Sequence, residues 1–320
     1  MKEEKPMIKH FLNIADYSSD LLKQIIRDAL ALKSHPDSAT KMLNGKTIAL
    51  LFEKPSTRTR ISFEVGVHQL GGAPIVLDNK SMQLGRGETV ADTAKVMSRY
   101  LDAIMIRADS HDTVLELSDH ADIPVINGLT DQSHPCQVMA DVMTMAEHKA
   151  PDLNFANMKV AWLGEGNNVS HSWIEAAVRF GFSLSLATPD QLQPDANIVA
   201  RAQAEGGAIT LTTDPADAIK DADVVVTDTW LSMSSSRSNS GGASGQTDAE
   251  VHKDLLTPYR VTTARMKEAA ADAIFMHCLP VYRGNEADAE VVDGAQSVIW
   301  DEAENRLHIQ KAIMCFCLNS

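Results

Sequence analysis

The sequence predicts an α/β protein of two domains, each with a parallel sheet flanked by helices. Apolar, β-branched segments alternate with helical patterns along the chain, which is typical of parallel sheets covered on both faces. Ten strand candidates are many for one sheet, so two sheets are expected. A chain of 320 residues, 44% of them hydrophobic, is long enough to bury a core in each domain.

The strand candidates are short and are bounded by polar or glycine-containing segments. A helical pattern over 137–149 leads into Ala150-Pro151-Asp152, where we place the boundary between a first domain, 1–150, and a second domain, 151–305. A further apolar helix is predicted over 307–318. The strand candidates are 47–52, 74–77, 103–107, 124–127, 159–163, 183–187, 208–212, 224–227, 273–276 and 298–300.

Composition limits the partners of this chain. A formal net charge of −14 argues against nucleic acid or an anionic membrane surface, so a small anionic substrate would need a local basic pocket. The sequence contains no apolar run that could span a bilayer, and its N-terminus lacks a signal core. Cys136, Cys278, Cys315 and Cys317 make no disulfide framework at this length, which favours a reduced, cytoplasmic enzyme.

The segment Ser56-Thr57-Arg58-Thr59-Arg60 predicts a phosphate site. It follows the first strand candidate and Pro55, and it opens a helical pattern that Gly71-Gly72 ends. Ser56 occupies the N-cap position, where free backbone N–H groups and the positive end of the helix dipole attract anions. Further hydroxyls and two guanidiniums at the same point complete a phosphate cradle that needs no glycine-rich loop.

Unusual polar residues also follow other strand candidates. Because ligands gather beyond the carboxyl ends of parallel strands, we expect these residues to line an active site in a cleft between the two domains. They are Arg107, His134-Pro135-Cys136-Gln137, Gly164-Glu165-Gly166-Asn167-Asn168, Asp228 and His277-Cys278-Leu279-Pro280.

The histidines and cysteines of these motifs allow more than one interpretation. His134 and Gln137 lie three residues apart at a helix start, so they share a face and could hydrogen-bond a carbonyl or an amide. A His-Pro pair also occurs in plain capped turns. Together with Cys136, His277 and Cys278, His134 could be proposed as a zinc site, but the spacing of zinc ligands is missing, and both thiols fit ordinary burial.

The turn from Gly164 to Val169 resembles a dinucleotide fingerprint. Val169 replaces its third glycine, however, and no ribose-binding acid follows at the expected distance. Asn167 and Asn168 could instead bind the α-carboxylate or α-amine of an amino acid, or could simply occupy a strand-to-helix turn. These residues by themselves leave the alternatives open.

Several motifs together resemble those of the ornithine carbamoyltransferases: F-E-K-P-S-T-R-T-R-x-S-F-E over 52–64, H-P-C-Q, D-T-W-x-S-M over 228–233, and H-C-L-P. The resemblance runs nearly end to end, from 10 to 307. Ser-Thr-Arg-Thr and His-Pro-x-Gln are shared with other transcarbamylases, whereas Ser232-Met233 and Cys278-Leu279-Pro280 indicate the ornithine branch.

The resemblance implies transfer of a carbamoyl group from carbamoyl phosphate to the δ-amine of L-ornithine, giving L-citrulline and phosphate within arginine metabolism. It implies no metal, no cofactor and no covalent intermediate. The first domain, with a C-terminal helix of about 306–320 packing back on it, would bind carbamoyl phosphate, and the second domain would bind ornithine. A homotrimer, or a multiple of trimers, is also implied.

Site residues follow from the same resemblance. The catalytic residues would be Arg107, His134, Asp228 and Cys278. Ornithine would be bound by Asn168, Asp228, Ser232 and Met233. Gln83 would reach the active site of a neighbouring subunit. Carbamoyl phosphate would be bound by Ser56, Thr57, Arg58, Thr59, Gln83, Arg107, His134, Gln137, Cys278, Leu279 and Arg306.

The chemistry of this reaction agrees with these residue types. Attack by an amine places negative charge on the carbamoyl oxygen and then on the leaving phosphate, so fixed donors aimed at both are required, each worth roughly 10²–10³ in rate. A lysine-like amine has a pKa of about 10.4, so presenting it neutral near pH 7 costs on the order of 4–5 kcal/mol. We expect Asp228 to bind the α-amino group, and partly desolvated surroundings near Cys278 to favour the neutral δ-amine.

Three other functions stay open on sequence alone. One is a transcarbamylase with a different acceptor, such as putrescine or an acylated ornithine, although Asp228 with Ser232-Met233 favours a free α-amino acid. A second is a nicotinamide-dependent dehydrogenase, which leaves Ser-Thr-Arg-Thr-Arg and His-Pro-Cys-Gln unexplained. The third is a paralogue that binds carbamoyl phosphate without turnover.

Ser234 departs from the resemblance, because the family has a glycine there, followed by a charged segment that closes over the amino acid. Here Ser234 begins a Ser/Gly-rich run over 234–246, and we expect ornithine to bind more weakly or the loop to close more slowly. Ser234→Gly should therefore lower the KM for ornithine or raise turnover, measured as citrulline formation. Unchanged values of both would mean that the run is passive.

Overall fold

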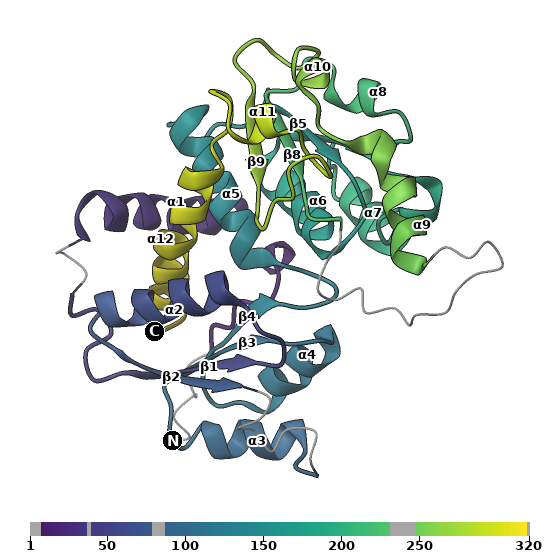
Figure 1. Ribbon diagram of the computed structural model, residues 1–320. Coiled ribbons are helices and arrows are strands. Elements are labelled where there is room, and N and C mark those ends of the chain that lie inside the picture. Colours follow the sequence, from purple (N-terminus) through teal and green to yellow (C-terminus); the bar gives the residue numbers. More distant parts are fainter. Residues whose placement is uncertain (1–7, 37–39, 79–86, 231–246, 319–320) are drawn as a thin grey trace. The chain divides into compact units, whose positions relative to one another are not determined.

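The computed structural model describes residues 8–36, 40–78, 87–230 and 247–318, and these form two compact units (Figure 1). The first unit comprises Met1–Met143 with Glu304–Ser320, and the second comprises Thr144–Ala303. Each unit has its own parallel sheet, so the predicted α/β fold with two sheets is confirmed.

The sheet of the first unit has the order β2-β1-β3-β4, and all neighbouring strands pair in parallel. Its two central strands are buried along almost their whole length, which explains their continuous apolar sequences. The strands are β1 (Thr47–Phe52), β2 (Ala73–Asp78), β3 (Ala103–Arg107) and β4 (Val125–Leu129).

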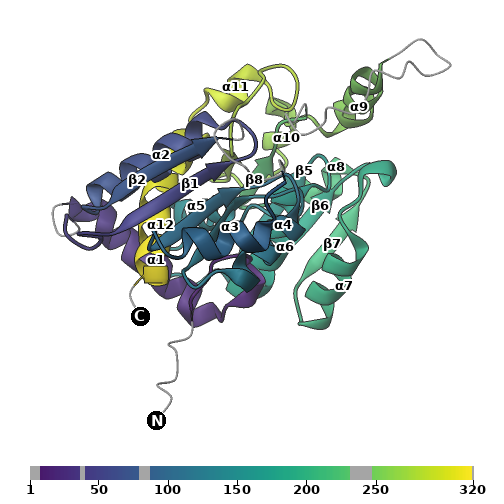
Figure 2. The same cartoon turned by 90° about the horizontal axis from the view of Figure 1, so that it is seen from below.

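Helices cover both faces of this sheet. Figures 1 and 2 show α3 and α4 on one face, where alternate residues of β1 and β3 pack against apolar residues of these helices. On α2, a Cβ built at Gly66 would lie 3.3 Å from Lys311 and Met314, so α12 packs closely along α2. The helices are α1 (Ser19–Ser34), α2 (Thr57–Gln69), α3 (Val90–Met97) and α4 (His111–His120), with parts of α5 (Pro135–His148) and α12 (Ile299–Leu318).

Helix α2 begins and ends where the sequence predicts. The Ser56 side chain caps its N-terminus by accepting from the Thr59 N–H at 3.4 Å. At the other end, Leu70 is followed by Gly71, whose φ of +81° is a left-handed conformation that favours glycine. The Ser56 cap thus fixes the first turn of α2 shortly after β1.

The sheet of the second unit has the order β7-β6-β5-β8-β9, also parallel throughout. Strand order reverses at β5, so the carboxyl ends of β5 and β8 meet at the switch point where ligands of such sheets bind. Its strands are β5 (Lys159–Leu163), β6 (Ser183–Ala187), β7 (Ile209–Thr212), β8 (Val224–Thr227) and β9 (Ile274–His277).

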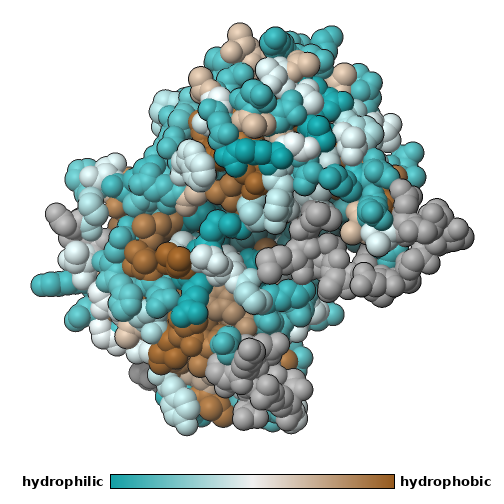
Figure 3. All heavy atoms as spheres, in the orientation of Figure 1, coloured by the Kyte–Doolittle hydropathy of each residue, from teal (hydrophilic) through white to brown (hydrophobic). Residues whose placement is uncertain are grey.

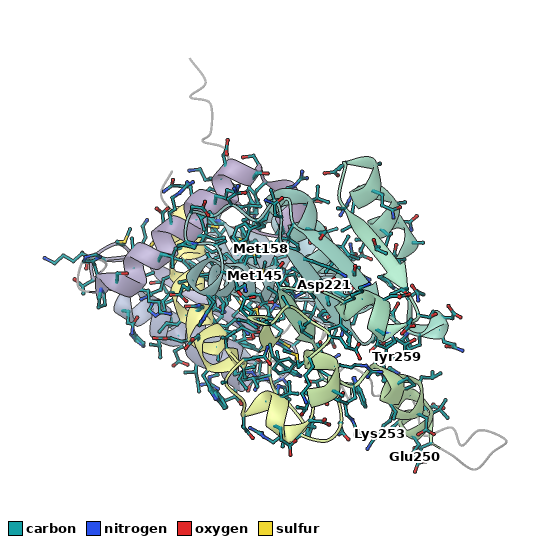
Figure 4. All side chains as sticks on the ribbon, turned by 90° about the horizontal axis from the view of Figure 1, so that it is seen from above. Met145, Met158, Asp221, Glu250, Lys253 and Tyr259 are labelled. Carbon is teal, nitrogen blue, oxygen red and sulfur yellow. The ribbon has the colours of Figure 1, made fainter. Side chains whose placement is uncertain are left out.

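One face of this second sheet packs on α8, α10 and α11 through a large apolar cluster that includes Phe275 and Ile219. Helix α9 begins with a capping box in which Thr247 and Glu250 bind each other's backbone N–H. Figure 4 shows Glu250 and Lys253 on this helix, pointing outward. The helices are α6 (Asn168–Phe180), α7 (Ala196–Ala204), α8 (Pro215–Ile219), α9 (Asp248–Leu256), α10 (Thr263–Met266) and α11 (Ala289–Val292).

Nine of the ten predicted strands form, several with the predicted bounds and the others within two residues of them. The strand predicted over 298–300 is wrong, because Ile299 begins α12, whose start was predicted at 307. Around Ser297 the chain pairs with Phe275 through a single bridge before the helix starts. A run of three apolar residues suits a strand and a helix start equally, so the pattern could not separate them.

Among the helices that the structure describes, none combines the length and apolar character that a membrane span requires.

Gly71 positions the end of α2, and Gly45 offers a matched comparison because its φ of +77° is similar. A Cβ at Gly45 meets no atom within 4 Å, whereas one at Gly71 would overlap the carbonyl oxygen of Thr40. Gly71→Ala should therefore lower the free energy of unfolding by about 1–3 kcal/mol more than Gly45→Ala does. Urea denaturation measures both, and equal losses would contradict this account.

Candidate active site

The N-terminus of α2 forms the centre of the candidate site in the first unit. Ser56 is half-buried at the N-cap, Thr57 and Arg58 are exposed in the first turn, and Thr59 is buried. Free backbone N–H groups and the positive dipole end lie at this point of the helix. An anion bound here would meet amides, hydroxyls and a guanidinium together.

Two further arginines reach the same helix start from distant parts of the chain. Arg107, at the end of β3, lies with Nη1 3.4 Å from Ser56 Oγ and 3.5 Å from Thr59 Oγ1. Arg306, on α12, donates through Nη2 to Thr59 Oγ1 at 3.0 Å. The buried Thr59 hydroxyl therefore joins two guanidiniums, and the tip of α2 is strongly cationic.

Gln137 belongs to the same cluster. Arg306 Nη1 donates to its amide oxygen at 2.6 Å, and its amide nitrogen donates to Asp141 Oδ1 at 2.7 Å. Gln137 and Asp141 lie one turn apart on α5 and are both buried. The carboxylate fixes which end of the amide faces Arg306. The sequence does not predict this contact, because Asp141 lies outside the His-Pro-Cys-Gln motif.

The loop that leads into His134 is held by a polar network. Ser133 Oγ accepts from Asn127 Nδ2 at 2.9 Å and donates to Asn13 Oδ1 at 2.9 Å. His111 continues the network through its Nδ1, 3.0 Å from Thr130 Oγ1. The loop between β4 and α5 is thus fixed by the N-terminal segment and the start of α4 as well as by its own turn.

The electrostatic surroundings of His134 keep its ring neutral. Burial, followed by the guanidiniums of Arg306, Arg107 and Arg58, holds the pKa of His134 well below its ordinary value of 6.5. Arg58, Arg107 and Arg306 therefore all lie close enough to the His134 ring to affect its charge. A neutral imidazole among fixed cations can donate a hydrogen bond to a carbonyl oxygen, or accept one from an amide N–H, without adding another charge.

Asp228 is the centre of the candidate site in the second unit. Its Oδ1 accepts from Cys278 Sγ at 2.9 Å and from the Thr229 N–H at 2.6 Å. Its Oδ2 accepts from Asn167 Nδ2 at 3.0 Å. Asp228 follows β8, Cys278 follows β9 and Asn167 follows β5, so three strand ends bring these side chains together, as the predicted site at the carboxyl edge requires.

Asn167, whose role the sequence alone leaves open, makes two kinds of contact. Its Oδ1 caps α6 by accepting from the N–H groups of Val169 and Ser170 at 3.0 and 3.1 Å. Its amide nitrogen then necessarily points the other way, toward Asp228. Asn168, the predicted ornithine residue, begins α6 and is half-buried beside it.

The glycines of this turn have a structural explanation. Gly164 has a φ of +145°, and a Cβ on Gly166 would overlap the backbone nitrogen of Pro194. The turn therefore needs glycine to pack on the segment after β6, whether or not a ligand approaches. The glycine pattern alone gives no support for a dinucleotide.

Of the remaining predicted site residues, the structure describes Leu279 but not Gln83, Ser232 or Met233. Leu279 follows Cys278 in the second unit with a left-handed φ of 62°. Gln83, Ser232, Met233 and the run over 234–246 lie outside the described residues. Within the described ranges, no group of three or more His, Cys, Asp or Glu side chains is arranged to hold a metal ion. Cys136 is buried instead, donates to the Asn127 carbonyl at 3.3 Å, and has its pKa raised by burial to about 12.

Two sequence models of domain families match the chain. One, described as the carbamoyl-P binding domain of aspartate/ornithine carbamoyltransferase, matches residues 9–147, and the other, described as its Asp/Orn binding domain, matches residues 156–317. The chain belongs to the aspartate/ornithine carbamoyltransferase family. The first match contains the cationic cluster at α2 except for Arg306, and the second contains Asp228, Cys278 and Arg306.

Individual members of the family are similar over nearly the whole chain. An ornithine carbamoyltransferase of Nitrobacter winogradskyi is 51% identical over 315 residues, covering 98% of each chain. The structure of ornithine carbamoyltransferase from Pyrococcus furiosus superposes with a TM-score of 0.87 at 41% identity, covering 98% of this chain and 97% of that one. The anabolic ornithine carbamoyltransferase of Campylobacter jejuni gives a TM-score of 0.87 at 38% identity, with coverage of 98% and 99%.

The lowered pKa of His134 predicts the pH dependence of stability. The unfolded state binds more protons than the folded state once the pH falls below about 6.5, so stability is lost as the pH drops from there, by at most about 1.4 kcal/mol per pH unit for each histidine. Burial also lowers the pKa of His10, His111 and His308, so they add to this loss.

His134→Gln should make the loss between pH 6.5 and 5 shallower, whatever its effect at pH 7.5. Urea denaturation at three pH values measures the slope. His120→Gln, at an exposed position on α4, is the matched control. An identical slope in wild type and His134→Gln would show that His134 does not resist protonation in the folded state.

Proposed function

We propose that this protein is an ornithine carbamoyltransferase, which converts carbamoyl phosphate and L-ornithine to L-citrulline and phosphate. The observation that carries the proposal is the cluster at the start of α2, where the Arg306 and Arg107 guanidiniums meet the Thr59 hydroxyl at 3.0 and 3.5 Å. Membership in the family, and relatives named ornithine carbamoyltransferase at about half identity, support the choice of substrates.

The phosphate group of carbamoyl phosphate binds at the α2 tip, to Ser56, Thr57, Arg58 and Thr59. A dianion suits this place, because backbone N–H groups and the helix dipole add to the guanidiniums. Arg107, Gln137 and the neutral His134 then surround the carbamoyl end. Their donors stabilise the charge that develops on its oxygen during attack.

Ornithine binds in the second unit, with its α-amino group on Asp228 and with Asn168 beside it. Asp228 is well suited to this role because Asn167 and the Thr229 N–H fix both of its oxygens in place. Ser232 and Met233 complete the site in the proposal by their position in the motif. The surroundings of Cys278 favour the neutral δ-amine, which alone carries the electron pair needed for attack.

The proposed reaction is a direct displacement. The δ-nitrogen forms a bond to the carbamoyl carbon, the bond from that carbon to the phosphate oxygen breaks, and phosphate leaves with the electron pair. The departing phosphate can accept the proton that the nitrogen loses. Catalysis therefore comes from positioning and electrostatic stabilisation, and the reaction uses no protein nucleophile.

We further propose a homotrimer, or a multiple of trimers, in which Gln83 reaches a neighbouring subunit's carbamoyl phosphate. Large apolar side chains are exposed on the first unit, including Ile61 (55%) and Val65 (38%) of α2 and Ile75 (43%) of the edge strand β2. Figure 3 shows apolar areas over this part of the molecule. Such surfaces suit burial against another subunit.

The proposed location is the cytoplasm, because the four free thiols fit a reducing compartment.

The main competing function is carbamoyl transfer to a different acceptor amine. The α2 cluster would serve any acceptor equally, so the choice of amine depends on Asp228. Putrescine has no α-carboxylate and N-acylated ornithine has no α-ammonium, so both lose contacts that Asp228 and Asn168 offer. Product formation with each of the three amines, at equal concentration, decides between them. A rate with N-acylated ornithine equal to the rate with ornithine would remove the assigned role of Asp228.

Arg58 provides the test of the proposed phosphate site, with Arg60 as its control. Both are exposed on the first turn of α2, but Arg60 Nε instead lies 3.4 Å from Glu64. Arg58→Gly should raise the KM for carbamoyl phosphate or lower kcat by a combined factor of about 100 or more, as expected when a phosphate-binding cation is lost. Arg60→Gly should stay within about threefold of wild type.

Citrulline formation at varied carbamoyl phosphate measures both variants. Equal effects of Arg58→Gly and Arg60→Gly would place the phosphate elsewhere, and a wild-type protein that makes no citrulline would overturn the proposed function itself.

A further inference from the structure

The backbone after β9 is held in an unusual conformation. Leu279 has a left-handed φ of 62°, which is disfavoured for a branched side chain and persists only where surrounding contacts fix it. Cys278, the residue before it, places its Sγ 2.9 Å from Asp228 Oδ1. Whatever fixes Leu279 therefore also sets the position of the Cys278 thiol.

His277 supplies one of these contacts. Its ring is fully buried, and its Nδ1 accepts the Leu279 N–H at 2.8 Å. Its own backbone N–H donates to the buried Glu302 Oε2 at 2.8 Å, which anchors the residue at the end of β9. His277 thus connects a rigid strand end to the first irregular N–H of the loop.

Glu286 supplies the second contact, on the far side of the same loop. It is also fully buried, and its Oε1 accepts the Tyr282 N–H at 2.6 Å. The same oxygen lies 3.4 Å from His277 Nε2. Because Nδ1 is an acceptor, the ring proton resides on Nε2, on the side facing Glu286. One buried pair therefore binds backbone groups at both ends of the segment 279–282.

A buried histidine and glutamate are costly compared with apolar residues of the same size. Neither side chain is among the residues assigned to substrate, and neither packs as an apolar core residue would. Instead, His277 Nδ1 and Glu286 Oε1 each accept a backbone N–H of the loop. A third tie comes from Thr229, whose hydroxyl donates to the Pro280 carbonyl, so Asp228's neighbour is bound to the same loop.

We infer that His277 and Glu286 form a positioning pair that holds the loop 278–282, and through it sets Cys278 against Asp228. His277 touches no substrate in this scheme and acts through Leu279. The effect on turnover rests on the proposed function, whereas the effect on the position of Cys278 does not.

Three substitutions separate the two ring nitrogens of His277. Asparagine can place its amide oxygen near the Nδ1 position and keep an acceptor for Leu279, whereas glutamine reaches toward the Nε2 position, and alanine keeps neither. His277→Ala should lower kcat by about 100-fold, because a displacement of about 1 Å at a reacting group has that effect. His277→Asn should recover most of this loss, and His277→Gln should not.

The second readout is the rate at which iodoacetamide alkylates Cys278. The protein is labelled in the assembly state in which it is purified, and mass spectrometry measures the label. Cys278 is partly exposed, while the other three thiols are buried and have raised pKa values, so they react slowly. Loosening the loop should change the labelling rate several-fold in His277→Ala and leave it near wild type in His277→Asn.

Glu175→Ala is the control for general destabilisation. Glu175 is a buried carboxylate of the same unit, bound to Arg201 at 2.7 Å. It should lower the melting temperature without changing the labelling of Cys278 or the kcat per folded molecule. Labelling that responds to both Glu175→Ala and His277→Ala would assign His277 a merely structural role.

Equal behaviour of His277→Asn and His277→Gln in kcat and labelling would overturn the inference, because it requires the Nδ1 acceptor specifically. A wild type without citrulline formation would overturn the proposed function alone, since the labelling pattern would still test the pair. If His277→Ala does not fold, the asparagine and glutamine variants carry the comparison.

Discussion

The start of helix α2 is the constraint on which the proposed chemistry of the first unit depends. A capped helix tip directly after a buried strand gives a fixed direction to its free N–H groups, and Ser56 uses its hydroxyl for that cap. Thr59, the buried residue one turn in, then carries contacts to Arg306 and Arg107. Because both arginines are anchored on a hydroxyl of the helix itself, their charges and the helix dipole point to one place. A shift of α2 would therefore move the whole cationic cluster together.

An acidic protein that binds an anion must concentrate its positive charge, and the surroundings of His134 show how this is done here. The formal net charge is −14, yet the His134 ring lies buried near three guanidiniums, and burial first, then these charges, lower its pKa and keep it neutral. A protonated His134 would add a fourth charge in a buried place, where repulsion and desolvation both oppose it. In the proposed site, the arginines would therefore supply charge, and the imidazole and the Gln137 amide would supply directed hydrogen bonds.

The sequence predicted much of the fold, and the parts of the candidate site that it indicated by local rules are contiguous in the chain. Ser56 to Arg60 could be interpreted from local capping rules, and the strand ends at Arg107 and Asp228 from the behaviour of parallel sheets. Asp141 and Asn127 could not be assigned this way, because their roles are set by partners brought close only by folding. The start of α12 was misplaced for a related reason: a three-residue apolar run contains no period, and its pairing with Phe275 decides where the strand-like segment stops.

Asn167 shows how folding and chemistry share one side chain in the second unit. Its amide oxygen stabilises α6 as an N-cap, a contribution of about 1 kcal/mol, and this contact fixes the direction of its amide nitrogen toward Asp228. Aspartate or serine would serve as well for the cap, but neither has a nitrogen that can donate to a carboxylate. Helix capping alone thus leaves the residue type open, and the second contact narrows it to asparagine. The orientation of Asp228 therefore depends on an amide whose own orientation the helix enforces.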